Sequence, residues 1–272
     1  NVKVIDRGVR IGYMLFNDHI ATAEQQLINA VTTLQAGNVT ELVLDIRYNG
    51  GGYLYIASEL AYMIAGSSRT EGRTFERLEF NDKYPNTDPV TGRALQPMPF
   101  FNTSDANVAL PTLNLNRVFV LTGAGTCSAS ESIMNGLRGV GVEVIQIGGT
   151  TCGKPYGFYA TDNCDITYFA IQFRGVNDAG FGDYTDGFSP QNTVTSPGTS
   201  VPGCSVRDDL NRQLGDPAEA RLAAALDYIA GGSCPTPPTG PVGASKTQAE
   251  GNIDGVLPRS PLRENRLLGP RI

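Results

Sequence analysis

The chain has 272 residues, of which 40% are hydrophobic and only 18% are charged, and its net charge is −6. This length suits one large domain or two modest ones, with ample material for a core. The acidic balance argues against nucleic acid or an anionic membrane surface as the main partner. No apolar run approaches the roughly 18 residues that a membrane-spanning helix needs. Gly and Pro supply 49 positions, which indicates many turns and loops.

Hydrophobic periodicity predicts strands and helices in the order of a layered α/β domain. The run at 41–47 is nearly continuous in apolar residues, which is typical of a strand buried on both faces of a parallel sheet. The expected strands are residues 2–5, 9–16, 41–47, 117–122, 142–147 and 166–174. The expected helices are residues 21–35, 53–65 and 217–230, together with one that begins just after Ser128.

Two segments differ in composition from this pattern. Within residues 70–110, apolar and polar residues alternate at 74–80, which is typical of a strand. The rest of this segment is rich in Pro, Asn, Asp and Thr. We interpret them as a loop excursion or lid within a core of residues 1–234. Residues 235–272 have the composition of a Pro/Gly-rich extended tail. We expect this tail to lie in a groove of its own chain or of a neighbouring molecule, so self-association through the tail is one expected form of partner.

Five cysteines are present, and none forms a CxxC pair. Because the chain has a single histidine to complete a zinc site, we expect no metal and no cofactor. Cys152 and Cys164 flank an expected hairpin. Cys204 and Cys234 flank the last helix. We therefore expect these two pairs as disulfides, with Cys127 left as a free thiol.

Disulfides favour an extracytoplasmic protein, whether periplasmic, in the cell envelope or secreted. The alternative is five reduced, partly buried thiols in a cytosolic protein. Because the chain begins at Asn1 without a Met, we expect a signal peptide or an upstream domain to have been removed.

The carboxyl ends of three expected strands carry residues suited to catalysis, and ligands collect at such ends in α/β sheets. The residues are the glycines at 50–52, Ser128 and Lys154. A serine at a strand-to-helix turn can act as a nucleophile, because the N–H groups that follow it point at an oxyanion. Glycine N–H groups can approach the same oxyanion. A desolvated lysine has a lowered pKa and can take the proton of the serine.

Each of these signals also has a plainer interpretation. Ser128 or Ser130 can simply cap the helix, with Glu131 in its first turn. The glycines can form only a tight turn, and Lys154 can be a solvated charge. His19, at another strand-to-helix turn, is a weaker candidate for a base, and it can equally be a polar group near the site or a surface histidine.

Two further features belong to the neighbourhood of these strand ends. Asp45 and Arg47 alternate with the apolar residues of the strand at 41–47, and we expect them to form a buried or edge ion pair. The turn at 186–190 is expected to return near the site.

The stretches 44–52, 125–131 and 149–154 resemble the three signature blocks of the C-terminal processing (tail-specific) serine peptidases, in that family's order and near its spacing. The similarity covers roughly residues 9–190. It implies a crotonase-like α/β core, of the ClpP/crotonase type, built from repeated ββα units. It further implies cleavage of peptide bonds near protein C-termini by a Ser–Lys dyad.

Carried over residue by residue, the resemblance assigns a role to each matching position. Ser128 resembles the nucleophile and Lys154 the general base. The amides of Gly51 and Ala129 resemble the oxyanion hole. The supporting residues are Glu131, as an orienting group, with Gly50 and Gly52.

The resemblance implies a serine endopeptidase that binds protein or peptide substrates as extended chains beside the site. The regulatory PDZ domain that many members carry is not evident, so we expect an N-terminal or regulatory domain outside this chain. The main alternative is a non-catalytic peptide- or ligand-binding relative with the same fold. A second alternative is an acyl-thioester enzyme, which would need a basic site for an adenine diphosphate, and the acidic chain shows no such cluster.

Overall fold

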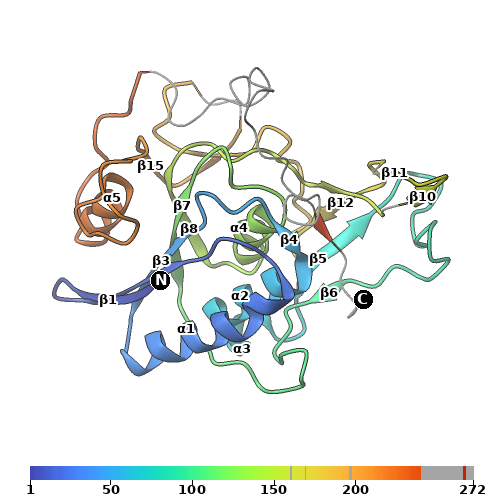
Figure 1. The fold of residues 1–272 in the computed structure, drawn as a ribbon, viewed down its shortest axis with the longest axis horizontal. Coiled ribbons are helices and arrows are strands. Elements are labelled where there is room, and N and C mark those ends of the chain that lie inside the picture. Colours follow the sequence, from blue (N-terminus) through green and yellow to red (C-terminus); the bar gives the residue numbers. More distant parts are fainter. Residues whose placement is uncertain (160, 169, 196–197, 240–265, 268–272) are drawn as a thin grey trace.

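The computed structural model describes residues 1–272 except 160, 169, 196–197, 240–265 and 268–272. Its centre is a six-stranded sheet in the order β1-β2-β3-β7-β8-β15 (Figure 1). β1 is antiparallel to β2, and every other neighbouring pair is parallel. The strands are β1 (Val2–Asp6), β2 (Arg10–Leu15), β3 (Glu41–Asp45), β7 (Arg117–Thr122), β8 (Glu143–Gly148) and β15 (Gly203–Ser205).

Helices cover both faces of this sheet, so its central strands have two buried faces, whereas the edge strand β1 is largely exposed (Figure 1). Leu42 and Leu44 belong to the core beneath α1, α2 and α4, whereas Val43 between them belongs to the core beneath α5. Alternate side chains of a strand point to opposite faces, so the apolar run at 41–47 forms a doubly buried parallel strand, as predicted. The helices are α1 (Glu24–Ala36), preceded by a 3-10 turn (Ala21–Ala23), then α2 (Leu54–Ala65), the short α3 (Ser67–Thr70), α4 (Ala129–Gly139) and α5 (Ala220–Ile229).

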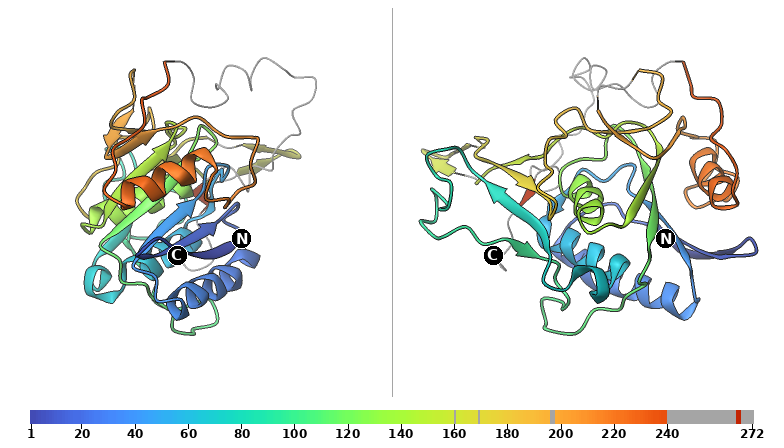
Figure 2. Two further views of the ribbon diagram at one scale, coloured as in Figure 1. Left: turned by 90° about the vertical axis from the view of Figure 1, so that its left-hand side faces the viewer. Right: turned by 180° about the vertical axis from the view of Figure 1, so that it is seen from behind.

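A second, antiparallel sheet in the order β6-β5-β12-β9 lies on the side of the molecule away from α5 (Figures 1 and 2). The strand predicted at 74–80 is confirmed as β5, so the 70–110 excursion contributes β5 and β6 to this sheet. The strand expected over 166–174 is divided between a hairpin strand and β12. The strands are β5 (Thr74–Glu79), β6 (Met98–Pro99), β9 (Tyr156–Gly157) and β12 (Phe173–Val176).

Three short strand pairs complete the described structure. Most of the expected tail at 235–272 lies outside the described residues, but one strand of it, β16, is described and pairs with β4. The pairs are β10 (Thr161–Asn163) with β11 (Ile166–Tyr168), β13 (Phe188–Pro190) with β14 (Thr199–Val201), and β4 (Gly52–Tyr53) with β16 (Arg266–Leu267).

Of the two expected disulfides, one is confirmed and the other is wrong. Cys204 and Cys234 are bonded, as expected. Cys152 pairs with Cys127 rather than with Cys164, across a Cα–Cα distance of 5.3 Å. The reason is that β7 and β8 are neighbours, so the turns that follow them lie side by side. Cys164 is an exposed free thiol at the two-residue turn of the β10–β11 hairpin.

These disulfides are typical of proteins outside the reducing cytosol. Among the described residues, no helix is long and apolar enough to cross a membrane. The same part of the chain holds no group of His, Cys, Asp and Glu side chains that could bind a metal ion.

Candidate active site

The three strand ends singled out in the sequence meet because β3, β7 and β8 are consecutive parallel neighbours. The glycine turn after β3 packs directly on the turn after β7. A Cβ atom on Gly51 would lie 2.7 Å from Ser128 Cβ and 3.0 Å from the Ala129 nitrogen. Gly51 also has φ +111°, a conformation that side chains rarely adopt. This position therefore requires glycine.

Ser128 stands at the N-terminus of α4 with a backbone that is unusual for serine. Its φ is +58° and its ψ is −118°. Strained conformations of this kind cluster at functional sites, where the surrounding structure enforces them. The Ser128 side chain is buried and stands in a capping box with Glu131 at the start of α4, while its Oγ makes no full hydrogen bond among the described residues. Ser130, the other serine considered, instead donates its hydroxyl to the Asn49 carbonyl at 2.9 Å, which is a structural role.

The buried carboxylate of Glu131 ties the turn of Ser128 to the turn of Lys154. It accepts the N–H groups of Ser128 at 2.9 Å, Gly153 at 2.8 Å and Lys154 at 2.8 Å, and the hydroxyl of Thr151 at 2.5 Å. Burial raises the pKa of Glu131, and these four hydrogen bonds act in the opposite direction. Glu131 thus holds two backbone segments in place.

The disulfide between Cys127 and Cys152 is a second, covalent tie between the same two turns. Cys127 directly precedes Ser128, and Cys152 stands two residues before Lys154. The Lys154 side chain is half-buried. Since Ser128 Oγ has no hydrogen-bond partner in the described structure, the expected Ser128–Lys154 hydrogen bond is not formed in this state.

The two amides expected to form an oxyanion hole differ in their present partners. The Gly51 N–H donates to the side-chain oxygen of Asn49 at 3.0 Å. The Ala129 N–H is the first amide of α4, and amides in the first turn of a helix have no partner within it. Gly52 is pressed against the His19 backbone, where a Cβ atom would lie 2.3 Å from the carbonyl oxygen, and Gly50 is buried beside these residues.

His19 is fully buried and contacts the loop that carries Asn49. Asn49 Nδ2 donates to the Phe16 carbonyl at 3.1 Å, so Asn49 Oδ1 is the acceptor for His19 Nδ1, 3.0 Å away. This assigns the proton to Nδ1 and leaves Nε2 buried without a hydrogen-bond partner among the described residues. Burial lowers the pKa of His19 to about 4, so the ring is neutral. Sequence reasoning considered His19 only as a base, a nearby polar group or a surface residue, and missed its role in holding Asn49.

A family model described as peptidase family S41 matches residues 10–158, more than half of the chain. The matched region contains the glycine turn, Ser128, Glu131 and Lys154. The chain belongs to peptidase family S41. The family-level resemblance drawn from the three sequence blocks is therefore confirmed.

Solved structures resemble this S41 family member over most of its length. A protein from Bacteroides fragilis NCTC 9343, described as an S41 protease, is 25% identical with a TM-score of 0.67, over 85% of this chain and 57% of that one. The photosystem II D1 C-terminal processing protease is 23% identical with a TM-score of 0.50, over 80% of this chain and 51% of its own, and shows the shared fold. The S41 chain thus spans little more than half the length of either protein. None of the curated proteins matches it.

A buried ion-pair network anchors the glycine turn of this S41 chain. Arg47 bonds Asp45 at 2.9 Å, which confirms the predicted pair. Its guanidinium also donates two hydrogen bonds, of 2.8 and 2.9 Å, to the carboxylate of Glu219, the N-cap of α5. A further hydrogen bond from the guanidinium reaches Asp208. No pattern in the sequence indicates Glu219, which is 172 residues away from Arg47. The turn at 186–190 returns beside Thr151, as predicted: the Thr151 N–H donates to the Phe188 carbonyl, and the Phe188 N–H donates to the Thr151 hydroxyl.

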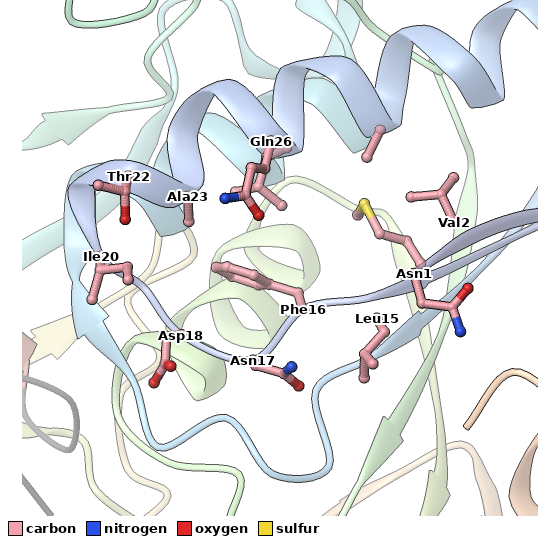
Figure 3. A pocket seen from close by; sticks show the side chains of 13 residues that line it. Asn1, Val2, Leu15, Phe16, Asn17, Asp18, Ile20, Thr22, Ala23 and Gln26 are labelled. Carbon is pink, nitrogen blue, oxygen red and sulfur yellow. The ribbon is translucent and has the colours of Figure 1, made fainter. Parts of the chain in front are cut away.

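A cavity of about 240 Å³ lies apart from Ser128, between the loop that ends β2 and the start of α1. Figure 3 shows the Phe16 ring between this loop and the helix, with Asp18 on the loop and Gln26 on α1. The other face of Phe16 approaches His19, with ring centres 4.5 Å apart. None of the residues that line the cavity belongs to the three strand-end turns.

Proposed function

We propose that this S41 chain is a serine endopeptidase in which Ser128 is the nucleophile and Lys154 the general base. The observation that carries the proposal is the single buried carboxylate, Glu131, that binds the backbone N–H groups of both residues. The buried, unpartnered hydroxyl of Ser128 at a strained turn supports the nucleophile. We also propose that the strands and helices form a crotonase-like core and that the protein acts outside the cytosol.

In the proposed reaction, a substrate peptide covers the half-buried Lys154 and excludes water, which lowers the pKa of its amine. The neutral amine then takes the proton from Ser128 Oγ while Oγ attacks the carbonyl carbon. Lys154 returns this proton to the leaving amine, which leaves an acyl-enzyme that water hydrolyses by the reverse proton route. The contact between Ser128 and Lys154, absent in the present state, is formed when substrate binds, as catalytic hydrogen bonds often are.

The proposed oxyanion hole consists of the Ala129 and Gly51 amides. The Gly51 N–H presently binds the neutral amide oxygen of Asn49. An oxyanion carries charge and is the stronger acceptor, so the Gly51 N–H is expected to turn from Asn49 to the oxyanion during the reaction. Hydrogen-bond donors aimed at the developing charge stabilise a tetrahedral intermediate.

The proposed substrates are protein chains cleaved near their C-termini, bound extended beside the site. The fold shared with a C-terminal processing protease supports this class of substrate. One observation favours a second candidate, a peptide-binding relative without catalysis: the Gly51 N–H is already bound to Asn49 Oδ1.

Hydrolysis of a mixture of extended peptides by the full chain tests the proposal. Ser128→Ala should abolish turnover, and Lys154→Ala should reduce it by about a thousandfold or more. Ser68→Ala and Lys83→Ala, at exposed positions, are matched controls that should keep wild-type turnover. A Ser128→Ala protein that cleaves at the wild-type rate would refute the mechanism. Peptide binding without hydrolysis by the wild-type chain would favour the binding relative.

A further inference from the structure

The strand β16 lies beside two other short strands, β4 and β9, and we call the place that it occupies the peptide slot. On one side it is parallel to β4, with Arg266 opposite Gly52 and Leu267 opposite Tyr53. The opposite edge of β4 is taken by His19, which bridges to Gly52. β16 also lies close to β9, the edge strand of the second sheet. Figure 1 shows β16 as the short red arrow beside β4.

The two strands beside the slot, β4 and β9, follow closely after the proposed catalytic turns in the sequence. β4 begins at the residue after Gly51, which packs on Ser128. β9 begins two residues after Lys154. An extended peptide that adds a strand to an exposed edge is held mainly by backbone hydrogen bonds, so almost any sequence can fit. A substrate strand lying across Ser128 would use this slot.

We infer that the segment containing Arg266 and Leu267 is an intramolecular occupant of the peptide slot and excludes substrate peptides from it. The exclusion of substrates rests on the proposed function, whereas the occupancy of the slot by this segment does not depend on it. The segment is tethered to the same chain, and tethering through a linker of some tens of residues gives an effective concentration in the millimolar range. A peptide in solution must compete with that concentration.

Backbone substitutions in the full chain test the occupancy. Successive N–H groups of a strand point to its opposite edges. Arg266→Pro and Leu267→Pro therefore each remove a backbone hydrogen-bond donor from a different edge of β16. Arg266→Ala and Leu267→Ala keep the backbone and serve as matched controls. If the slot is occupied most of the time, each proline should raise the affinity for an added peptide by about five- to tenfold, and each alanine should leave it within twofold.

The first readout is binding, which needs no catalysis. A fluorescent peptide with the sequence of residues 262–270 is titrated into each variant, and its anisotropy is measured. Tighter binding by the proline variants than by the alanine variants supports the inference. Equal binding by all four variants and the wild-type chain overturns it, whether or not the chain is a peptidase.

The second readout is hydrolysis of an extended fluorogenic peptide, together with labelling of Ser128 by a small fluorophosphonate that does not need the slot. A lower KM in the proline variants, with equal labelling of all variants, supports the inference. Labelling and hydrolysis that are equal in all variants overturn it and leave the proposed function intact. Absence of both reactions in every variant overturns the proposed function, and the binding titration then decides the occupancy. Inhibition that grows with enzyme concentration would assign the slot to a second copy and overturn the intramolecular claim.

Discussion

His19 should make the folded state lose stability as the pH falls below 7. The ring is fully buried, and its pKa is lowered to about 4, whereas an unfolded chain has a histidine pKa of about 6.5. Between these two values the unfolded chain binds a proton that the folded chain does not. Stability therefore falls as the pH drops through this window, and it is unaffected by His19 above pH 7.

The size of this effect follows from the two pKa values. A difference of about 2.5 units corresponds to about 3 kcal/mol once the pH is below 4, and about 2 kcal/mol of it is lost between pH 7 and pH 5. His19 is the only histidine of the chain, so this contribution can be isolated. His19→Asn keeps a side-chain N–H that can reach Asn49 Oδ1 and removes the titration.

The assay is urea unfolding of the wild-type and His19→Asn chains at pH 7 and pH 5, with both disulfides intact. The carboxylates titrate alike in the two proteins, so the difference between their two pH responses reports His19. We expect the wild-type chain to lose about 2 kcal/mol more than the variant. Equal pH responses, or an NMR titration that places the His19 pKa near 6.5, would refute the buried neutral ring.

Two further predictions concern the packing of the three turns. Gly51→Ala places a methyl group 2.7 Å from Ser128 Cβ at a φ of +111°, and the displaced serine should lower peptide turnover by about a hundredfold or more. Removing the disulfide with Cys127→Ala and Cys152→Ala opens a 25-residue loop and should lower the free energy of unfolding by about 3 kcal/mol, with a loss of turnover because both catalytic turns are released.

Each of these changes has a matched control in the chain. Gly8 also has a positive φ, of +81°, but a Cβ atom there would meet nothing within 4 Å, so Gly8→Ala should keep its turnover. The Cys204–Cys234 disulfide closes a loop of similar length, 30 residues, and neither cysteine belongs to the three turns, so its removal should cost similar stability without loss of turnover. Equal turnover in both disulfide variants would contradict the positioning role.

The meeting of the three turns could be predicted from the sequence because it depends on local patterns. Apolar runs identify the strands, and the carboxyl ends of neighbouring parallel strands share one edge. The glycines at 50–52, Ser128 and Lys154 each lie in the turn that follows such a run. The sequence blocks that carry the family resemblance are the same three turns, so fold and candidate site were predicted together.

The contacts that hold the turns could not be predicted, because they depend on which distant segments become neighbours. The partner of Cys152 is decided by the adjacency of β7 and β8, whereas the spacing along the chain favoured Cys164. Glu219 reaches Arg47 only because α5 packs on the far face of the sheet. From the sequence His19 can be a base, a polar group near the site or a surface histidine, and its complete burial becomes known only from the structure.

The most direct test of the central claim is to treat the full chain with a fluorophosphonate probe and to locate the adduct by mass spectrometry, with Lys154→Ala as the comparison. If Lys154 activates Ser128 as the nucleophile, the wild-type chain should carry a single adduct on Ser128, and the lysine variant should lose it. An adduct on another serine, or labelling of Ser128 that is unchanged by Lys154→Ala, would contradict it.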